Sequence, residues 1–249
     1  MTESGSAALT QRQALDRAAR WPLARLLAGV ALAAAVAVGV VLLLASEVGW
    51  VDSLDRAVNR AWVDAALAHD WLVTLGKAVT RWGNTPMVIL ITAVTAVWQV
   101  VRRRPALATW LVLTLVTGWL LNHVMKAVVD RARPPTDGLF LDALGSSFPS
   151  GHAQVGGYAW VAFGLLALLL LRNRLRLAVA WCCWLLGVGI ALSRVLLGVH
   201  WLTDVVAGAL VGWTWFALVT LLFGGRILRF GKPAERVGTT AMALGGTER

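Results

Sequence analysis

A twelve-residue stretch, SRVLLGVHWLTD (residues 193–204), carries four polar side chains within an otherwise apolar region. They are a hydroxyl, a guanidinium, an imidazole and a carboxylate, on Ser193, Arg194, His200 and Asp204. His200 and Asp204 are four residues apart, so on a helix they share one face and the carboxylate can fix one imidazole tautomer. The other ring nitrogen would then be free to act as a nucleophile.

Two further motifs supply groups that favour an anion. KAVVDRARP holds Lys126, Arg133 and Pro134, and PSGH occupies residues 149–152. With Arg194 these motifs provide three cationic donors and no matching excess of acids, which favours phosphate over a metal ion. The PSG segment leading into a helix would add backbone N–H donors and the positive end of a helix dipole. We therefore expect a site for a tetrahedral oxyanion.

The PSGH motif also contributes a second imidazole, on His152. If His152 faces the side of the bound phosphate opposite His200, it can protonate the departing oxygen as a general acid. The cations would stabilise the charge on the oxygens of the transferring group. The pattern predicts two histidines with different tasks around one phosphorus atom.

The composition indicates which elements must position these groups. With 58% hydrophobic and only 14% charged residues, the chain is far more apolar than a soluble domain. Lipid offers no partner for backbone polar groups outside a helix, so long apolar runs predict transmembrane helices of about 20 residues. Six such runs predict an all-α, six-span integral membrane protein, and they lie at 26–45, 86–101, 106–125, 153–171, 177–192 and 205–223.

The distribution of basic residues predicts the orientation. They are concentrated before the first run, between the second and third, between the fourth and fifth, and after the sixth. This alternation follows the positive-inside rule and predicts cytoplasmic termini, with all three motifs on the extracytoplasmic side of a bacterial plasma membrane. At span ends the charged groups avoid much of the roughly 2.5–3.5 kcal/mol cost of the bilayer centre. The net charge of +10 follows the same alternation, so we expect no nucleic-acid partner.

The remaining segments complete the predicted organisation. Residues 1–20 are expected to be a cytoplasmic tail, 21–230 the six-span domain and 231–249 a disordered cytoplasmic tail. Residues 51–83 mix apolar and charged positions at helical spacing, which predicts an amphipathic segment along the outer surface between the first two spans. Five glycines are expected to permit close helix packing: Gly187, Gly189, Gly198, Gly208 and Gly212.

The three motifs, K-x6-RP, PSGH and SR-x5-H-x3-D, resemble in this order the signature motifs of the type 2 phosphatidic acid phosphatase (PAP2) superfamily, in its membrane lipid phosphatase branch. The resemblance implies hydrolysis of a phosphate ester or anhydride without metal or cofactor, through a phosphohistidine on His200. It implies that Asp204 assists His200 and that His152 serves the leaving group. The superfamily also contains soluble vanadate-dependent haloperoxidases, but six predicted spans argue against that branch. The residues implied to hold phosphate oxygens are Lys126, Arg133, Ser150, Gly151, Ser193 and Arg194.

A pocket at a span end would let an apolar tail stay in the bilayer while the head group enters. We therefore expect a lipid phosphate or diphosphate substrate, such as phosphatidate, phosphatidylglycerol phosphate or undecaprenyl diphosphate. Two alternatives stay open, a phosphotransferase that passes the phosphoryl group to another lipid or sugar, and a non-catalytic lipid-head-group transporter. The sequence leaves the oligomeric state open. It assigns no chemistry to Asp130 or Arg131, and His123 is expected to be a buried, hydrogen-bonded helix residue.

Overall fold

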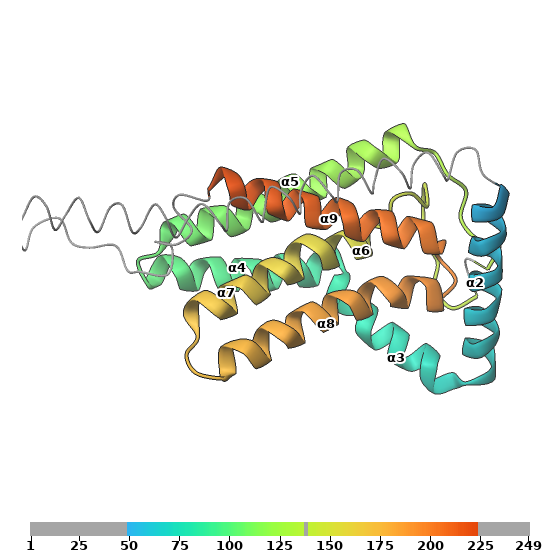
Figure 1. Ribbon diagram of the computed structural model, residues 1–249, viewed down its shortest axis with the longest axis horizontal. Helices are drawn as coiled ribbons and strands as arrows, with labels where there is room; N and C mark the ends of the chain where they lie inside the picture. The colour runs from blue at the N-terminus through green and yellow to red at the C-terminus, as the bar shows by residue number, and fades with distance from the viewer. Residues whose placement is uncertain (1–48, 137–138, 224–249) are drawn as a thin grey trace, which may run out of the picture.

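The computed structural model describes residues 49–136 and 139–223, and this part of the chain is all-helical (Figure 1). The predicted first span at 26–45 and both predicted tails lie outside the described residues. The elements are α2 (Gly49–Ala68), α3 (Asp70–Thr80), the 3-10 turn η1 (Arg81–Gly83), α4 (Thr85–Val101), α5 (Pro105–Val128), α6 (Gly151–Val155), the π-helical turn η2 (Gly156–Trp160), α7 (Val161–Leu170), α8 (Leu175–Leu196) and α9 (Leu202–Leu222).

Four helical segments in the described ranges are long and apolar enough to cross a membrane. They are α5, the continuous segment Gly151–Leu170, α8 and α9. A fifth is possible if Asp70–Gly83 and Thr85–Val101 form one span that is bent by 49°. An all-helical architecture with four or five candidate spans is therefore confirmed for the described residues. The count of six spans depends on residues 26–45 and stays a prediction.

Residues 51–83 fold as α2 and α3, and α2 crosses one end of the bundle (Figure 1). Along α2, a residue that faces the bundle recurs about every four positions, as expected for a helix with one buried face. Its buried residues are Val51, Asp55, Asn59, Val63 and Ala66. The opposite side is charged, and Arg56 there forms an ion pair with Asp52. The position of α2 relative to the membrane surface stays a prediction.

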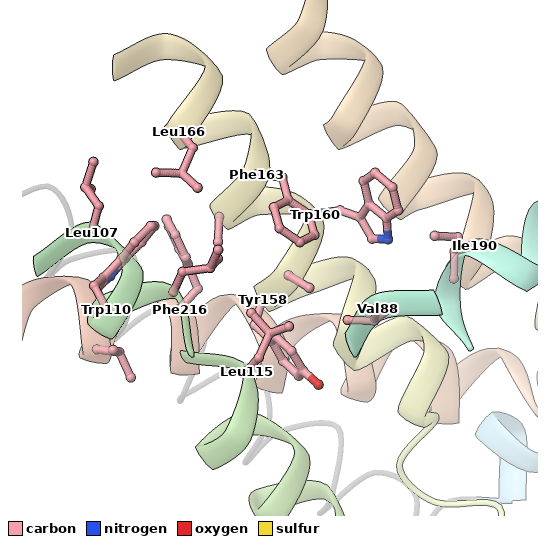
Figure 2. Close-up of a cluster of buried hydrophobic side chains, with 14 residues drawn as sticks. Val88, Leu107, Trp110, Leu115, Tyr158, Trp160, Phe163, Leu166, Ile190 and Phe216 are labelled. Carbon is pink, nitrogen blue, oxygen red and sulfur yellow. The ribbon is translucent and has the colours of Figure 1, made fainter. Parts of the chain in front are cut away.

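The largest apolar cluster of the described chain joins α4, α5, η2, α7, α8 and α9 (Figure 2). Trp110 of α5 meets Phe216 of α9 edge to face, with ring centroids 6.2 Å apart. Trp160 meets Phe163 in the same way at 5.6 Å. Such edge-to-face pairs add to the stabilisation that burial of the rings gives. This core holds together the helices whose ends carry the three motifs.

The segment α6–η2 packs so closely against α9 that the backbones of the two helices are in contact. A Cβ atom on Gly208 would lie 2.4 Å from the carbonyl oxygen of Ser150, and one on Gly212 would lie 2.3 Å from that of Gln154. Gly187 of α8 makes a similarly close approach from the other side. The prediction that glycines serve helix packing is confirmed at these three positions. The close approach brings the PSGH motif alongside the start of α9.

Candidate active site

The turn between α8 and α9 depends on Gly198, whose φ is +69°. The N–H of Val199 donates to the carbonyl of Arg194 (3.2 Å) and the N–H of Gly198 to that of Val195 (3.0 Å). This is the pattern by which a helix ends at a glycine in the left-handed region. The turn places His200 outside both helices, directly before α9.

His200 and Asp204 meet, although not as neighbours on a helix. Because α9 begins at Leu202, His200 precedes the helix and Asp204 lies in its first turn. Oδ2 of Asp204 accepts the N–H of Trp201 (3.0 Å) and lies 3.6 Å from Nδ1 of His200. The predicted shared helix face is therefore wrong. The contact arises because Asp204 folds back over the N-terminus of α9 as a capping residue.

The protonation state of His200 suits a nucleophile. Burial lowers the pKa of His200 to about 4, although the nearby Asp204 carboxylate acts in the opposite direction. The ring is therefore neutral at pH 7. With Nδ1–H directed towards a carboxylate, the lone pair is on Nε2, which lies 3.4 Å from Nη1 of Arg133. An unprotonated ring nitrogen facing a cation can attack an anion held there.

Arg133 and Lys126 both reach the backbone of residues 144–146. Arg133 donates to the carbonyls of Leu144 and Gly145 at 3.0 Å each, and to that of Val199 at 2.8 Å. Lys126 donates to the carbonyl of Ser146. The loop carbonyls therefore hold the two cations beside His200 and limit their mutual repulsion.

Arg194 approaches the same cluster from α8. Its side chain is 6% exposed, and Nη1 donates to the hydroxyl of Thr80 in α3 at 2.9 Å. It is close enough to interact electrostatically with Lys126 and His200. The structure thus brings together the three predicted cations from three separate segments.

Ser150 and Gly151 lie at the start of α6, beside α9. The N–H of Ser150 donates to the carbonyl of Asp204 at 3.0 Å. Ser150 is fully buried, and its hydroxyl has no hydrogen-bond partner among the described residues. A buried hydroxyl in that state can serve a bound ligand. Gly151 has little room for a side chain, because a Cβ atom there would lie 3.2 Å from Oδ1 of Asn122.

Two residues differ from expectation. The hydroxyl of Ser193 donates to the carbonyl of Ile190 at 2.7 Å, so its proton points into its own helix. His123 is exposed, with Nδ1 bonded to the carbonyl of Trp119 (2.9 Å), so the expectation of a buried histidine is wrong. The reason is helical phase, since the packed face of α5 is the one that carries Asn122.

His152 is held by a residue that sequence reasoning missed. Its Nε2 donates to Oδ1 of Asn84 at 2.9 Å, at the bend where η1 meets α4. Gly83 packs against the same ring, since a Cβ atom there would lie 2.7 Å from Cδ2 of His152. His152 is within electrostatic reach of His200 and Arg194, so both imidazoles belong to one cluster. No local signal connects Asn84 with a histidine so distant in the chain.

Sequence reasoning also missed Arg131 and Asp55. Arg131 bonds to Asp204 directly, and Asp55 bonds to Arg131. Arg131 donates to Oδ1 of Asp204 (2.6 Å) and to Oδ2 of Asp55 (2.8 Å). The position of Arg131 inside the first motif was a usable signal. Nothing in the sequence around Asp55 indicates that its helix reaches the site.

An apolar cavity of about 490 Å³ lies between α4 and α5 and reaches Val155 and Tyr158. Thr85 follows Asn84 in the chain, and Val155 lies one helical turn after His152, so the cavity begins next to the cluster. From Thr85 to Ala93 it follows α4 for about 12 Å at 1.5 Å per residue. The lining residues are Thr85, Val88, Ile89, Thr92, Ala93, Val112, Leu115, Val116, Trp119, Val155 and Tyr158.

Known proteins are similar to this chain in the segment that carries the cluster. Residues 107–228 match the family model described as the PAP2 superfamily. Phosphatidylglycerophosphatase B of Bacillus subtilis is 29% identical over 182 residues, which cover 72% of this chain and 88% of that protein. Lipid A 1-phosphatase of Rhizobium johnstonii is 35% identical over 129 residues, 48% of this chain and 49% of the relative. Undecaprenyl-diphosphatase of Sulfolobus acidocaldarius is 34% identical over 137 residues, 51% of this chain and 60% of the relative.

A solved structure has the same fold. The crystal structure described as the first transmembrane PAP2 type phosphatidylglycerolphosphate phosphatase, from Bacillus subtilis, superposes with a TM-score of 0.68. The sequence identity is 23%, and the match covers 83% of this chain and 98% of that chain. The family match covers the segment that carries all three motifs, so residues 107–228 are a PAP2 superfamily domain.

Proposed function

We propose that the protein is a membrane phosphatase that releases phosphate from a lipid phosphate or diphosphate at the cluster of His200, Asp204 and His152. One observation carries the proposal: a buried, neutral imidazole has a carboxylate behind Nδ1 and an arginine 3.4 Å from Nε2. A transporter that only grips head groups has no use for an oriented nitrogen lone pair among its cations.

In the proposed reaction, Nε2 of His200 attacks phosphorus, and the N–P bond forms as the bond to the leaving oxygen breaks. The negative charge of the bound phosphate favours a proton on His152, which His152 then gives to that oxygen. Neutral His152 then takes a proton from water, which attacks the phosphohistidine, so the N–P bond breaks and inorganic phosphate leaves. Asp204 stabilises the positive charge that appears on the ring of His200 during attack.

The phosphate oxygens would be held by Lys126, Arg133 and Arg194, with the hydroxyl of Ser150 and the N–H of Gly151. Ser193 joins this set only by turning its hydroxyl away from its own helix. Charged donors of this kind stabilise the transferring group without a metal ion. We therefore expect turnover to persist in EDTA, and vanadate to inhibit competitively.

The apolar cavity between α4 and α5 supports a lipid as the substrate. Its volume and lining fit a stretch of acyl or prenyl chain whose head group reaches the cations. The three relatives named above are phosphatases of phosphatidylglycerophosphate, lipid A and undecaprenyl diphosphate, by their names. The distribution of basic residues supports a site on the extracytoplasmic face with both termini in the cytoplasm.

The test is phosphate release by purified protein in mixed micelles, with phosphatidate, phosphatidylglycerol phosphate and undecaprenyl diphosphate as substrates. We expect inorganic phosphate as the product in the absence of any acceptor, which separates hydrolysis from transfer. His200→Ala should abolish release while lipid binding persists. Release by His200→Ala at the wild-type rate would refute the proposal, and absence of release from every lipid would favour the transporter.

A further inference from the structure

We infer that Asp55 and Arg131 are positioning residues for the His200–Asp204 pair, with Asp55 sharing the arginine that would otherwise neutralise Asp204. This inference rests on the proposed function of that pair. It concerns two residues outside the proposed set of phosphate ligands and histidines: Asp55 on the helix α2, and Arg131 on the stretch that follows α5 and also carries Arg133.

Arg131 bridges two buried carboxylates with one guanidinium. Nη1 donates to Oδ1 of Asp204 at 2.6 Å and to the hydroxyl of Thr203 at 2.7 Å, while Nη2 donates to Oδ2 of Asp55 at 2.8 Å. Asp55 and Asp204 are both 0% exposed. Arg131 also lies over the ring of Trp201, 5.7 Å from its centroid. A planar fork with this many partners has one orientation, so it fixes the carboxylate of Asp204.

Asp55 in turn fixes the first turn of α9. Its Oδ1 accepts the N–H of Thr203 at 3.0 Å, and its Oδ2 accepts the hydroxyl of the same residue. The first of these bonds satisfies one of the backbone N–H groups that the start of a helix leaves without a partner inside the helix. Since Asp204 is the next residue along, a shift of α2 would move the carboxylate that faces His200.

The balance of charge gives Asp55 a role beyond anchoring. Burial opposes the charged form of Arg131, but attraction by Asp204 and hydrogen bonds to both carboxylates raise its pKa, so it stays a cation. Two carboxylates and one guanidinium leave a net charge of −1 behind the imidazole. If Arg131 served Asp204 alone, that net charge would be zero. The positive charge that develops on His200 during attack would then have no net counter-charge.

The test is a double-mutant cycle of Asp55→Asn and Asp204→Asn, with an activated aryl phosphate as substrate so that slow variants stay measurable. We expect Asp55→Asn alone to lower kcat by about tenfold or more with KM changed by less than about twofold. In the Asp204→Asn background the same change should alter kcat by less than about twofold, because the carboxylate through which Asp55 acts has been removed.

Asp52→Asn is the matched control, since Asp52 lies on the same helix, is exposed and forms an ion pair with Arg56 one turn further along. It should leave kcat and KM unchanged. Vanadate inhibition reports the integrity of the site in every variant, because the proposed anion ligands are untouched. Its inhibition constant should stay within about twofold of the wild-type value in Asp55→Asn.

Three results would overturn the inference: wild-type kcat in Asp55→Asn, an equal fold-loss in both backgrounds, or parallel loss of vanadate inhibition in a folded protein. If Asp55→Asn gives no folded protein, the same cycle with Arg131→Lys decides, since an ammonium group keeps the charge but lacks the planar fork that holds both carboxylates in place. The variant His200→Ala distinguishes failure of the proposed function from failure of the positioning role. Full activity of that variant refutes the proposed function, whereas an inactive His200→Ala with a normal Asp55→Asn refutes the positioning role alone.

Discussion

At the scale of single residues, the two imidazoles sit in different surroundings. His200 is buried with a carboxylate at Nδ1, whereas the half-buried His152 bonds to the amide oxygen of Asn84. A carboxylate stabilises a positive ring, while a neutral amide oxygen mainly fixes its orientation. These surroundings fit a nucleophile on one side and a residue that exchanges protons on the other.

The first prediction concerns the titration of His200. Because burial holds its pKa near 4, the ring should be neutral at pH 6 and gain a proton only in more acid solution. The unfolded chain binds that proton at higher pH, so this residue should make the folded state less stable as pH falls from about 6.5 to about 4. Nitrogen-15 NMR of the four histidines checks this, with His200→Gln to assign the signal. A midpoint near 6.5 would contradict it.

The second prediction concerns the leaving group. His152→Ala should reduce turnover of an alkyl phosphate by about 10²–10⁴-fold, and turnover of an activated aryl phosphate much less, since the latter needs little protonation. Asn84→Ala should show the same selectivity to a smaller degree, because the ring loses only its orientation. Rates on the two substrates check both variants. Equal losses on both substrates would argue against an acid role for His152.

At the scale of elements, the site depends on how closely α9 approaches α6. Gly212→Ala places a Cβ atom 2.3 Å from the carbonyl oxygen of Gln154, so the helices must separate. We expect a loss of about 1–3 kcal/mol of stability together with reduced kcat. Gly189→Ala is the control, because its nearest neighbour is a side-chain atom of Val79 at 3.4 Å. Thermal unfolding in detergent should show a lower midpoint for the first variant only.

The apolar cavity allows a second prediction at this scale. Ala93→Phe fills the cavity beside α4 and should raise KM for a long-chain lipid phosphate about tenfold, which corresponds to ~1.4 kcal/mol of lost chain contact. Turnover of a water-soluble aryl phosphate should not change. Val94→Phe is the matched control, since Val94 is exposed and does not line the cavity. Equal effects on both substrates would show that the variant damages the site itself.

The elements also show what the sequence could predict. Apolar runs identified five helical segments to within a few residues, because a helix that faces lipid has a long, nearly continuous run of apolar residues. The motifs identified the residues that the structure gathers at one end of the bundle. The geometry of His200 could not be inferred, because it depends on where α9 begins and on how Asp204 caps it. Asn84 and Asp55 reach the site only through tertiary packing, which leaves no pattern in the local sequence.

At the scale of the whole molecule, the motifs gather at the end of the bundle that α2 crosses, while the α7–α8 loop lies at the other end (Figure 1). We predict that these ends face opposite sides of the membrane. In a variant with Cys182 and Cys183 replaced by Ala, Leu144→Cys should react with a membrane-impermeant maleimide on intact cells, because Leu144 is 95% exposed. Asn173→Cys, in the loop between α7 and α8, should react only after permeabilisation. The reverse pattern would invert the proposed orientation.

The carbonyl oxygens of residues 144–146 already accept hydrogen bonds from Arg133 and Lys126. Under the proposed function, a phosphate that binds there would compete with these neutral carbonyl acceptors for part of the donors. The strength of binding would then depend partly on how many of these loop hydrogen bonds the phosphate replaces. A doubly charged monoester competes for these donors better than a singly charged diester. We therefore predict that the loop carbonyls favour doubly charged over singly charged head groups at the moment of entry, before any bond is broken.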